Sequence, residues 1–246
     1  MLDKFISLNP ITQTIIASTI ACLMTILGSS IIYLFNNVSK KVMNILLSIS
    51  AGIMLSSSIF SLLIESINEF NNNVLLVSLI IIITIIMLII ADLLTSKKTN
   101  NNLLLLVTSI ILHNIPEGMA IGVAFASINN PVISAISLSL GIGIQNIPEG
   151  SAVSIPLLKS GVSKKTSFLI GVLSAIVEPI SAIIGAILVT KIYNLLPIML
   201  SIAAGAMLYV TISDLIPECI NKDNRNSMSL IIIISFLIMM ILEIGL

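Results

Sequence analysis

The chain has 246 residues, of which 57% are hydrophobic and 9% are charged, and its formal net charge is +0. With a mean hydropathy of +1.17, too few polar residues remain to cover a water-soluble globule, so the composition indicates a polytopic membrane protein. The basic residues are scattered singly or in pairs, which excludes nucleic acid as a partner.

Apolar runs of roughly the 20 residues that cross a bilayer follow one another along the chain. We predict an all-α protein with eight membrane-spanning helices, in which residues 1–246 form a single transmembrane domain. The first run is longer than the apolar core of a secretory signal and is expected to be retained. The expected spans are about 11–35, 42–67, 73–95, 103–127, 131–157, 165–189, 194–218 and 228–246.

Basic residues are concentrated in alternate loops, after the first, third, fifth and seventh spans. Because basic loops stay in the cytoplasm, this pattern predicts a protein of the cytoplasmic membrane with both termini outside the cytoplasm. The fourth and fifth spans are then antiparallel neighbours. The residues on the basic side are Lys40, Lys41, Lys97, Lys98, Lys159, Lys164, Lys165, Lys222 and Arg225, against Lys4 and Lys191 on the other side.

One motif occurs twice, once in each of these neighbouring spans. Asn-Ile-Pro-Glu-Gly stands at residues 114–118 and again at residues 146–150. A carboxylate at the centre of a membrane helix costs roughly 2.5–3.5 kcal/mol, and the proline leaves a backbone carbonyl without its helical partner. Accepting both penalties twice indicates a functional site inside the bundle. The motif read in opposite directions through the membrane is typical of an inverted repeat.

Helical spacing adds further donors to this site, because residues three and four apart share a helix face. Helical rise also places Glu178 in the sixth span and Met54 in the second span near the membrane midplane. The alternative is that the amides only join helices and that Met54 fills a gap in the core. The candidate metal ligands are Met54, His113, Asn114, Glu117, Gln145, Asn146, Glu149 and Glu178.

Imidazole, carboxylate, amide and thioether groups together suit Zn²⁺, or Fe²⁺, Mn²⁺, Co²⁺ or Cd²⁺, better than Ca²⁺ or Mg²⁺. Crowded carboxylates hold protons until a metal ion displaces them, so we predict that metal affinity rises between about pH 5 and pH 8.

Acidic residues also stand at the ends of the spans. Glu65 and Glu69 fit either a solvated rim or an entrance funnel for cations. At the opposite membrane face, Asp92, Asp214 and Glu218 fit either an exit path for the cation or helix caps. The two cysteines, Cys22 and Cys219, have no paired spacing and are expected to be reduced core residues.

Several motifs resemble, in order along the chain, those of the ZIP (Zrt-, Irt-like protein) divalent-metal transporters, in particular the prokaryotic GufA-like branch. They are the paired motifs of spans four and five, Ala51-Gly-Ile-Met54-Leu, Val177-Glu178-Pro179, and Ala203-Ala-Gly-Ala-Met-Leu-Tyr209 leading to Ile216-Pro-Glu218. The resemblance implies an eight-helix carrier, usually a homodimer, that moves zinc and related ions into the cytoplasm.

The resemblance also implies a two-metal site between the central helices. Its first position would be lined by Met54, His113, Glu117, Gln145 and Glu149. Its second position would be lined by Asn114, Glu117, Asn146, Glu149 and Glu178. Two departures matter: Asn146 stands where an aspartate is common, and Ser213-Asp214 replaces a frequent His-Glu pair. The first removes a charge from the second position, and the second predicts a weaker exit relay.

These observations favour a transporter over an enzyme, with the metal ion as substrate and no catalytic cofactor. The chain has no phosphate-binding loop of the GxxxxGK[ST] type, which argues against coupling to nucleotide hydrolysis. An intramembrane metal-dependent hydrolase is an alternative, but the single histidine and the missing His-Glu-x-x-His motif argue against it. A passive cation channel would use the same acids and stays open as an alternative.

Overall fold

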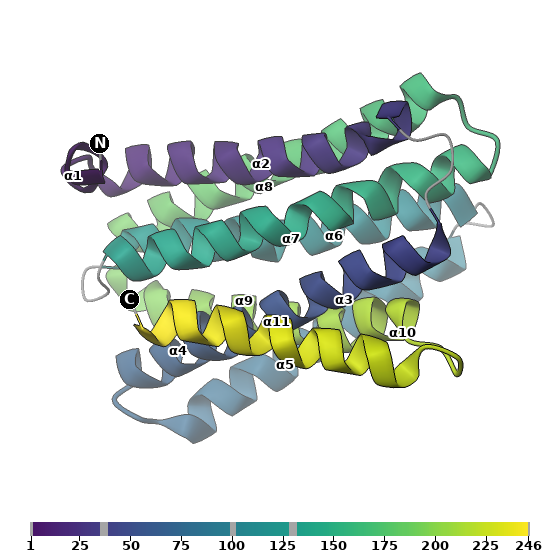
Figure 1. Cartoon of the computed structure of the whole chain (residues 1–246). Coiled ribbons are helices and arrows are strands. Elements are labelled where there is room, and N and C mark those ends of the chain that lie inside the picture. Colours follow the sequence, from purple (N-terminus) through teal and green to yellow (C-terminus); the bar gives the residue numbers. More distant parts are fainter. Residues whose placement is uncertain (1, 35–38, 99–101, 128–131, 246) are drawn as a thin grey trace.

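The computed structural model describes residues 2–34, 39–98, 102–127 and 132–245, apart from the side chains of Leu2, Asp92 and residues 95–98 and 102–113. All regular elements in these ranges are helices, which confirms the all-α prediction (Figure 1). They are α1 (Leu2–Ile6), α2 (Pro10–Leu34), α3 (Lys40–Ser57), η1 (Ser58–Leu63), α4 (Ile64–Glu69), α5 (Val74–Lys98), α6 (Asn102–Ala126), α7 (Val132–Lys159), α8 (Lys164–Lys191), η2 (Tyr193–Leu195), α9 (Leu196–Val210), η3 (Thr211–Leu215), α10 (Ile216–Cys219) and α11 (Arg225–Gly245).

Six helical segments in the described ranges are long and apolar enough to cross a membrane. They are α2, the continuous segment Lys40–Glu69, α5, α8, the segment Tyr193–Cys219 and α11. The multi-pass membrane architecture is thereby confirmed. The two remaining long helices, α6 and α7, have 25 and 28 residues and carry the repeated polar motif. That these two also cross the bilayer, giving eight spans, stays a prediction.

Two of the long segments contain a wider helical turn that the sequence pattern did not indicate. The π-helical turn η1 follows α3, and the π-helical turn η3 follows α9. At the start of each turn a hydroxyl group donates to the carbonyl four residues earlier: Ser58 to Met54, and Thr211 to Met207. Such side-chain bonds loosen the regular backbone ladder. Both wide turns therefore begin at a hydroxyl residue that lies four positions after a methionine.

The long helices form two bundles that lie side by side (Figure 1). The first bundle consists of α2, α6, α7 and α8, and its most extensive contacts join α2 to α7 and α8, and α6 to α8. The second bundle consists of α3, α5, α9 and α11, with α3 packed on α11 and α5 packed on α9. Between the bundles, α3 contacts α7 and α6 contacts α9.

Within the first bundle, glycines bring helix backbones into direct contact. A methyl group at Gly28 of α2 would lie 2.0 Å from the carbonyl oxygen of Ile147 in α7. Likewise, a methyl group at Gly118 of α6 would lie 2.2 Å from the carbonyl oxygen of Glu178 in α8. Small residues allow this close approach in membrane proteins. Both contacts are made at the level of the repeated motif.

Both chain ends lie at the same end of the molecule (Figure 1). The first turns of α3 and α8 and the last turn of α7, which carry lysines, lie at the opposite end. We call this the lysine-rich end. The cysteines Cys22 and Cys219 are buried and free, which agrees with their interpretation as reduced core residues.

Candidate metal site

The two glutamates of the repeated motif lie next to each other where α6 meets α7. Glu117 is fully buried and Glu149 is half-buried, and their carboxyl groups are within hydrogen-bonding reach of each other. The Gln145 side chain, one helical turn before Glu149, donates from Nε2 to Oε1 of Glu117 over 3.2 Å. The structure therefore gathers both copies of the motif at one place.

Glu178, in the middle of α8, is held by donors from other helices of the same bundle. Thr25 Oγ1 on α2 donates to Glu178 Oε1 over 2.7 Å, and Asn146 Nδ2 on α7 donates to Glu178 Oε2 over 2.7 Å. Asn114 Nδ2 on α6 lies 3.5 Å from Glu178 Oε1 and donates over 2.9 Å to the carbonyl of Ser174. Both oxygens of this carboxylate therefore have a close donor.

In contrast, four buried side-chain oxygens around the glutamate pair have no hydrogen-bond partner among the described residues. They are Glu117 Oε2, Glu149 Oε1, Gln145 Oε1 and Asn146 Oδ1. Leaving a buried polar atom unpaired costs about 1–3 kcal/mol, so such atoms are rare in folded proteins. Carboxylate and amide oxygens are suitable ligands for a divalent cation. This oxygen set can hold one.

Acidic side chains alone do not complete this site. Among the side chains that the structure describes, no three His, Cys, Asp or Glu groups come close enough to hold a metal ion. The other donors would have to be amides, a thioether or an imidazole. The imidazole of His113 lies outside the described side chains, but the backbone of α6 places this residue four positions before Glu117, on the same helix face.

Met54 approaches from the second bundle. Its side chain is buried, with 1% of its surface exposed, and lies in α3 four residues after Ser50. The Ser50 hydroxyl donates to the backbone carbonyl of Gln145 over 2.9 Å, so this face of α3 lies against the motif in α7. The structure therefore brings the two bundles together at the level of the candidate site.

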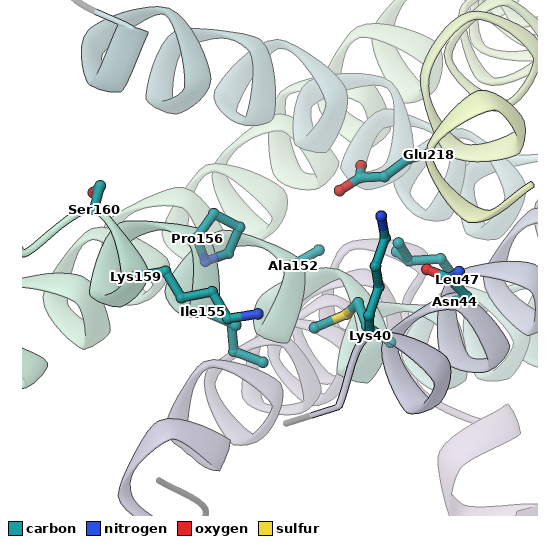
Figure 2. Close-up of a pocket in the computed structure, with 10 residues that line it drawn as sticks. Lys40, Asn44, Leu47, Ala152, Ile155, Pro156, Lys159, Ser160 and Glu218 are labelled. Atoms are coloured by element: carbon teal, nitrogen blue, oxygen red, sulfur yellow. The ribbon is translucent and has the colours of Figure 1, made fainter. Parts of the chain in front are cut away.

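The acids predicted for an exit path lie toward the lysine-rich end. Glu218 in α10 is exposed and lines a cavity between α3, α7 and α10 (Figure 2). Asp214 in η3 is half-exposed and lies four residues before Glu218, on the same side of this helical segment. The side chain of Asp92 lies outside the described residues.

At the other end of the molecule, Glu69 accepts hydrogen bonds from the hydroxyl of Tyr193, at 3.2 and 3.3 Å from its two oxygens. Glu243, which the sequence interpretation did not single out, accepts 2.7 Å bonds from Ser56 and Ser61. Glu243 therefore joins α11 to α3 and its wide turn.

Thr25 and Ser50, which contact the candidate ligands, were also missed. Both are hydroxyl residues in apolar helices, and many such residues bond only to their own helix. Ser18, for example, donates to the carbonyl of Thr14 over 2.7 Å. The available signal was the position of Thr25 three residues before Gly28, on the face that packs against α7.

The sequence of this chain is similar to those of known zinc transporters. A family model described as ZIP Zinc transporter matches residues 97–243, a range that contains both copies of the motif together with Glu178 and Glu218. The zinc transporter ZIP11 of Homo sapiens is 44% identical over 142 residues, which are 56% of this chain and 42% of that protein.

Two bacterial zinc transporters are also similar to part of this chain. The zinc transporter GufA of Myxococcus xanthus is 38% identical over 110 residues, which are 45% of this chain and 42% of that protein. The zinc transporter ZupT of Clostridium perfringens is 35% identical over 111 residues, which are 44% of this chain and 38% of that protein. The chain thus covers less than half the length of these curated relatives.

Proposed function

Because the chain belongs to the ZIP zinc transporter family, we propose that it moves divalent transition-metal ions, zinc first among them, across the cytoplasmic membrane into the cytoplasm. The observation that carries this proposal is the set of unpartnered buried oxygens on Glu117, Gln145, Asn146 and Glu149. A buried carboxylate pair with free oxygens and adjacent amides is suited to a cation and has no evident structural use.

The amides would take the place of the cation while it is absent. Gln145 Nε2 faces Glu117, and Asn146 Nδ2 faces Glu178. Rotation of either carboxamide by a half-turn about its last bond would replace the N–H donors with the free Oε1 or Oδ1. Metal binding would then exchange amide–carboxylate hydrogen bonds for metal–oxygen bonds, without moving the backbone. Imidazole from His113 and the thioether of Met54 would bias such a site toward Zn²⁺ and similar ions.

The route toward the lysine-rich end follows one face of α7 and one face of α3. On α7, Ala152 and Pro156 follow Glu149 by three and seven residues, and both line the cavity shown in Figure 2. On α3, Leu47 precedes Met54 by seven residues and lines the same cavity. The positive-inside rule would make this end cytoplasmic. The direction of transport proposed here is therefore from the ends of the chain toward the lysine-rich end.

The two bundles offer a means of alternating access. Among the described residues, the Ser50 hydroxyl bonds to the carbonyl of Gln145 across the two bundles, at the level of the site. Movement of one bundle against the other would expose the site first at one end and then at the other. The homodimer implied by the family resemblance is also proposed. Only 6% of the apolar segment Val74–Ala91 of α5 is buried within the chain, which leaves this surface available for a partner subunit or for lipid.

The test is zinc uptake into liposomes that contain the purified full-length protein. We expect saturable uptake that falls to background for Glu117→Ala and for Glu149→Ala. Asp223→Ala serves as the matched control, because Asp223 is exposed in the connection before α11. Full uptake by both glutamate variants would contradict the proposal, and uptake that rises linearly with zinc concentration would favour a channel.

A further inference from the structure

A second polar region lies at the lysine-rich end, apart from the carboxylate centre. A cavity of about 460 Å³ opens there, between α3 and α10 on one side and α7 on the other (Figure 2). Its polar lining includes Lys40, Asn44, Lys159 and Glu218, and most of the remaining wall is apolar. A water molecule takes about 30 Å³ in the liquid, so the cavity has room for a small anion with part of its hydration shell.

The two lysines come from different bundles. Lys40 is the first residue of α3, and its ammonium group points toward the carboxylate of Glu218, whereas Lys159 is the last residue of α7 and extends toward the space between α7 and α3 (Figure 2). Neither ammonium group has a salt-bridge partner within the described part of the chain. Both lysines are exposed and Glu218 offsets one of their two charges, so an anion between the ammonium groups would be attracted by the remaining positive charge.

Asn44 provides an independent indication of a ligand. It lies one turn after Lys40 on the same face of α3, is 5% exposed, and lines the cavity. Its backbone carbonyl accepts the hydroxyl of Ser48 over 2.7 Å, but its carboxamide has no partner among the described residues. The Asn44 N–H groups are therefore free to donate to an oxygen atom of a bound molecule.

We propose that this cavity binds a phosphate group, with Lys40, Lys159 and Asn44 donating to its oxygens. Lysine ammonium groups bind phosphate as compact point charges, and charge-assisted hydrogen bonds of this kind are the stronger ones. Glu218 faces the same cavity and repels an anion, but the two lysines leave the lining net positive. The phosphate is either that of a lipid headgroup or a soluble phosphate. A bound phosphate would also neutralise the lysines beside the proposed cation route, although the binding itself does not depend on that route.

The first experiment titrates the full-length protein with sodium phosphate in a phosphate-free detergent, by isothermal titration calorimetry. We expect saturable binding that weakens about tenfold in Lys40→Gln and in Lys159→Gln, because each loses one charge-assisted bond. Glu218→Gln should bind several-fold more tightly, since it removes the opposing charge. Lys165→Gln is the matched control: Lys165 is exposed at the start of α8, at the same end but outside the cavity.

A second arm separates the two sources of phosphate. Native mass spectrometry would count the phosphatidylglycerol molecules retained by the wild type and by the Lys40→Gln/Lys159→Gln double variant. A glycolipid without phosphate, counted in the same way, is the control lipid. Selective loss of phosphatidylglycerol from the double variant would identify a headgroup, whereas calorimetric binding without this loss would identify a soluble phosphate.

Three results would overturn the proposal: no saturable binding of either probe, an equal loss in Lys165→Gln, or unchanged affinity in Glu218→Gln. Thermal unfolding of each variant checks that the fold is retained.

Discussion

The glutamate pair of the repeated motif and Glu178 occupy one buried centre but are held in different ways. Both oxygens of Glu178 have a donor at 2.7 Å, one from Thr25 and one from Asn146. In the pair formed by Glu117 and Glu149, one oxygen of each residue has no hydrogen-bond partner among the described side chains. Glu178 is thus positioned by the protein itself, whereas no described side chain satisfies the remaining oxygens of the pair. The comparison indicates that the pair Glu117 and Glu149, rather than Glu178, depends on the transported ion to satisfy its oxygens.

The largest effect on zinc uptake is expected when the carboxylates of Glu117 and Glu178 are neutralised in two separate variants. We expect Glu117→Gln to reduce zinc uptake to background, because a neutral amide cannot supply the charge that balances the cation. Glu178→Gln should keep a measurable fraction of wild-type uptake, since its neighbours already donate to it. Uptake in liposomes at several zinc concentrations measures both. Equal loss in the two variants would remove the distinction between the halves.

Asn146→Asp should change the number of bound ions. In the structure this amide donates to Glu178, and an aspartate would place a second carboxylate there instead. Without metal the like charges should lower the free energy of unfolding by about 1–3 kcal/mol, whereas with metal the new carboxylate can act as a ligand.

The measurement for Asn146→Asp is metal content per protein by mass spectrometry, together with thermal unfolding with and without zinc. We expect one ion per chain in the wild type and two in the variant. The same content in both proteins would show that residue 146 does not control the second position.

Thr25→Val tests whether the positioning of Glu178 matters for metal affinity. The hydroxyl bond to Oε1 would be lost while the side-chain shape is nearly kept, and loss of a group that orients a metal ligand typically weakens affinity about 10–100-fold. The lower end is expected, because Asn146 still holds the other oxygen. Thr19→Val on the same helix is the control, since Thr19 is exposed and its hydroxyl donates to the carbonyl of Ile15. Equal zinc affinity in the Thr25 and Thr19 variants would refute a positioning role.

The smallest effect is expected for Ser50→Ala, which removes a hydrogen bond between the two bundles rather than one within the site. A net contribution of about 0.5–1.5 kcal/mol corresponds to a change of roughly two- to tenfold in the balance between conformations. Transport rate should therefore change more than zinc affinity. Ser48→Ala is the control, because the Ser48 hydroxyl bonds to the carbonyl of Asn44 and contacts Cys219, both within the second bundle and its attached helix α10. A change confined to affinity would place Ser50 among the ligand-positioning groups instead.

The place of the buried acidic centre could be predicted from the sequence, for a physical reason. Acids inside apolar helices are costly, so the positions of Glu117, Glu149 and Glu178 within apolar runs are enough to indicate a shared polar centre. Hydroxyl residues give no comparable signal, because a threonine such as Thr19 can satisfy itself on its own helix. Thr25 also lies 3.3 Å from the carbonyl of Ala21 on its own helix, and its shorter 2.7 Å bond to Glu178 depends on the packing of α2 against α8. The wide turns that begin at Ser58 and Thr211 give no signal either, because Ser18 makes the same bond to the carbonyl four residues earlier inside the regular helix α2.

The glycine contacts of the first bundle have a consequence for how an ion would travel. With Gly28 against Ile147 and Gly118 against Glu178, neighbouring backbones touch and cannot slide past one another without separating. The Thr25 bond to Glu178 joins these two pairs of helices, so the carboxylates on α6, α7 and α8 keep a fixed depth relative to one another. If the bundles shift during a transport cycle, the ligands on α6, α7 and α8 would move together with the ion, and only the thioether of Met54, on α3 of the second bundle, would change its distance from the ion.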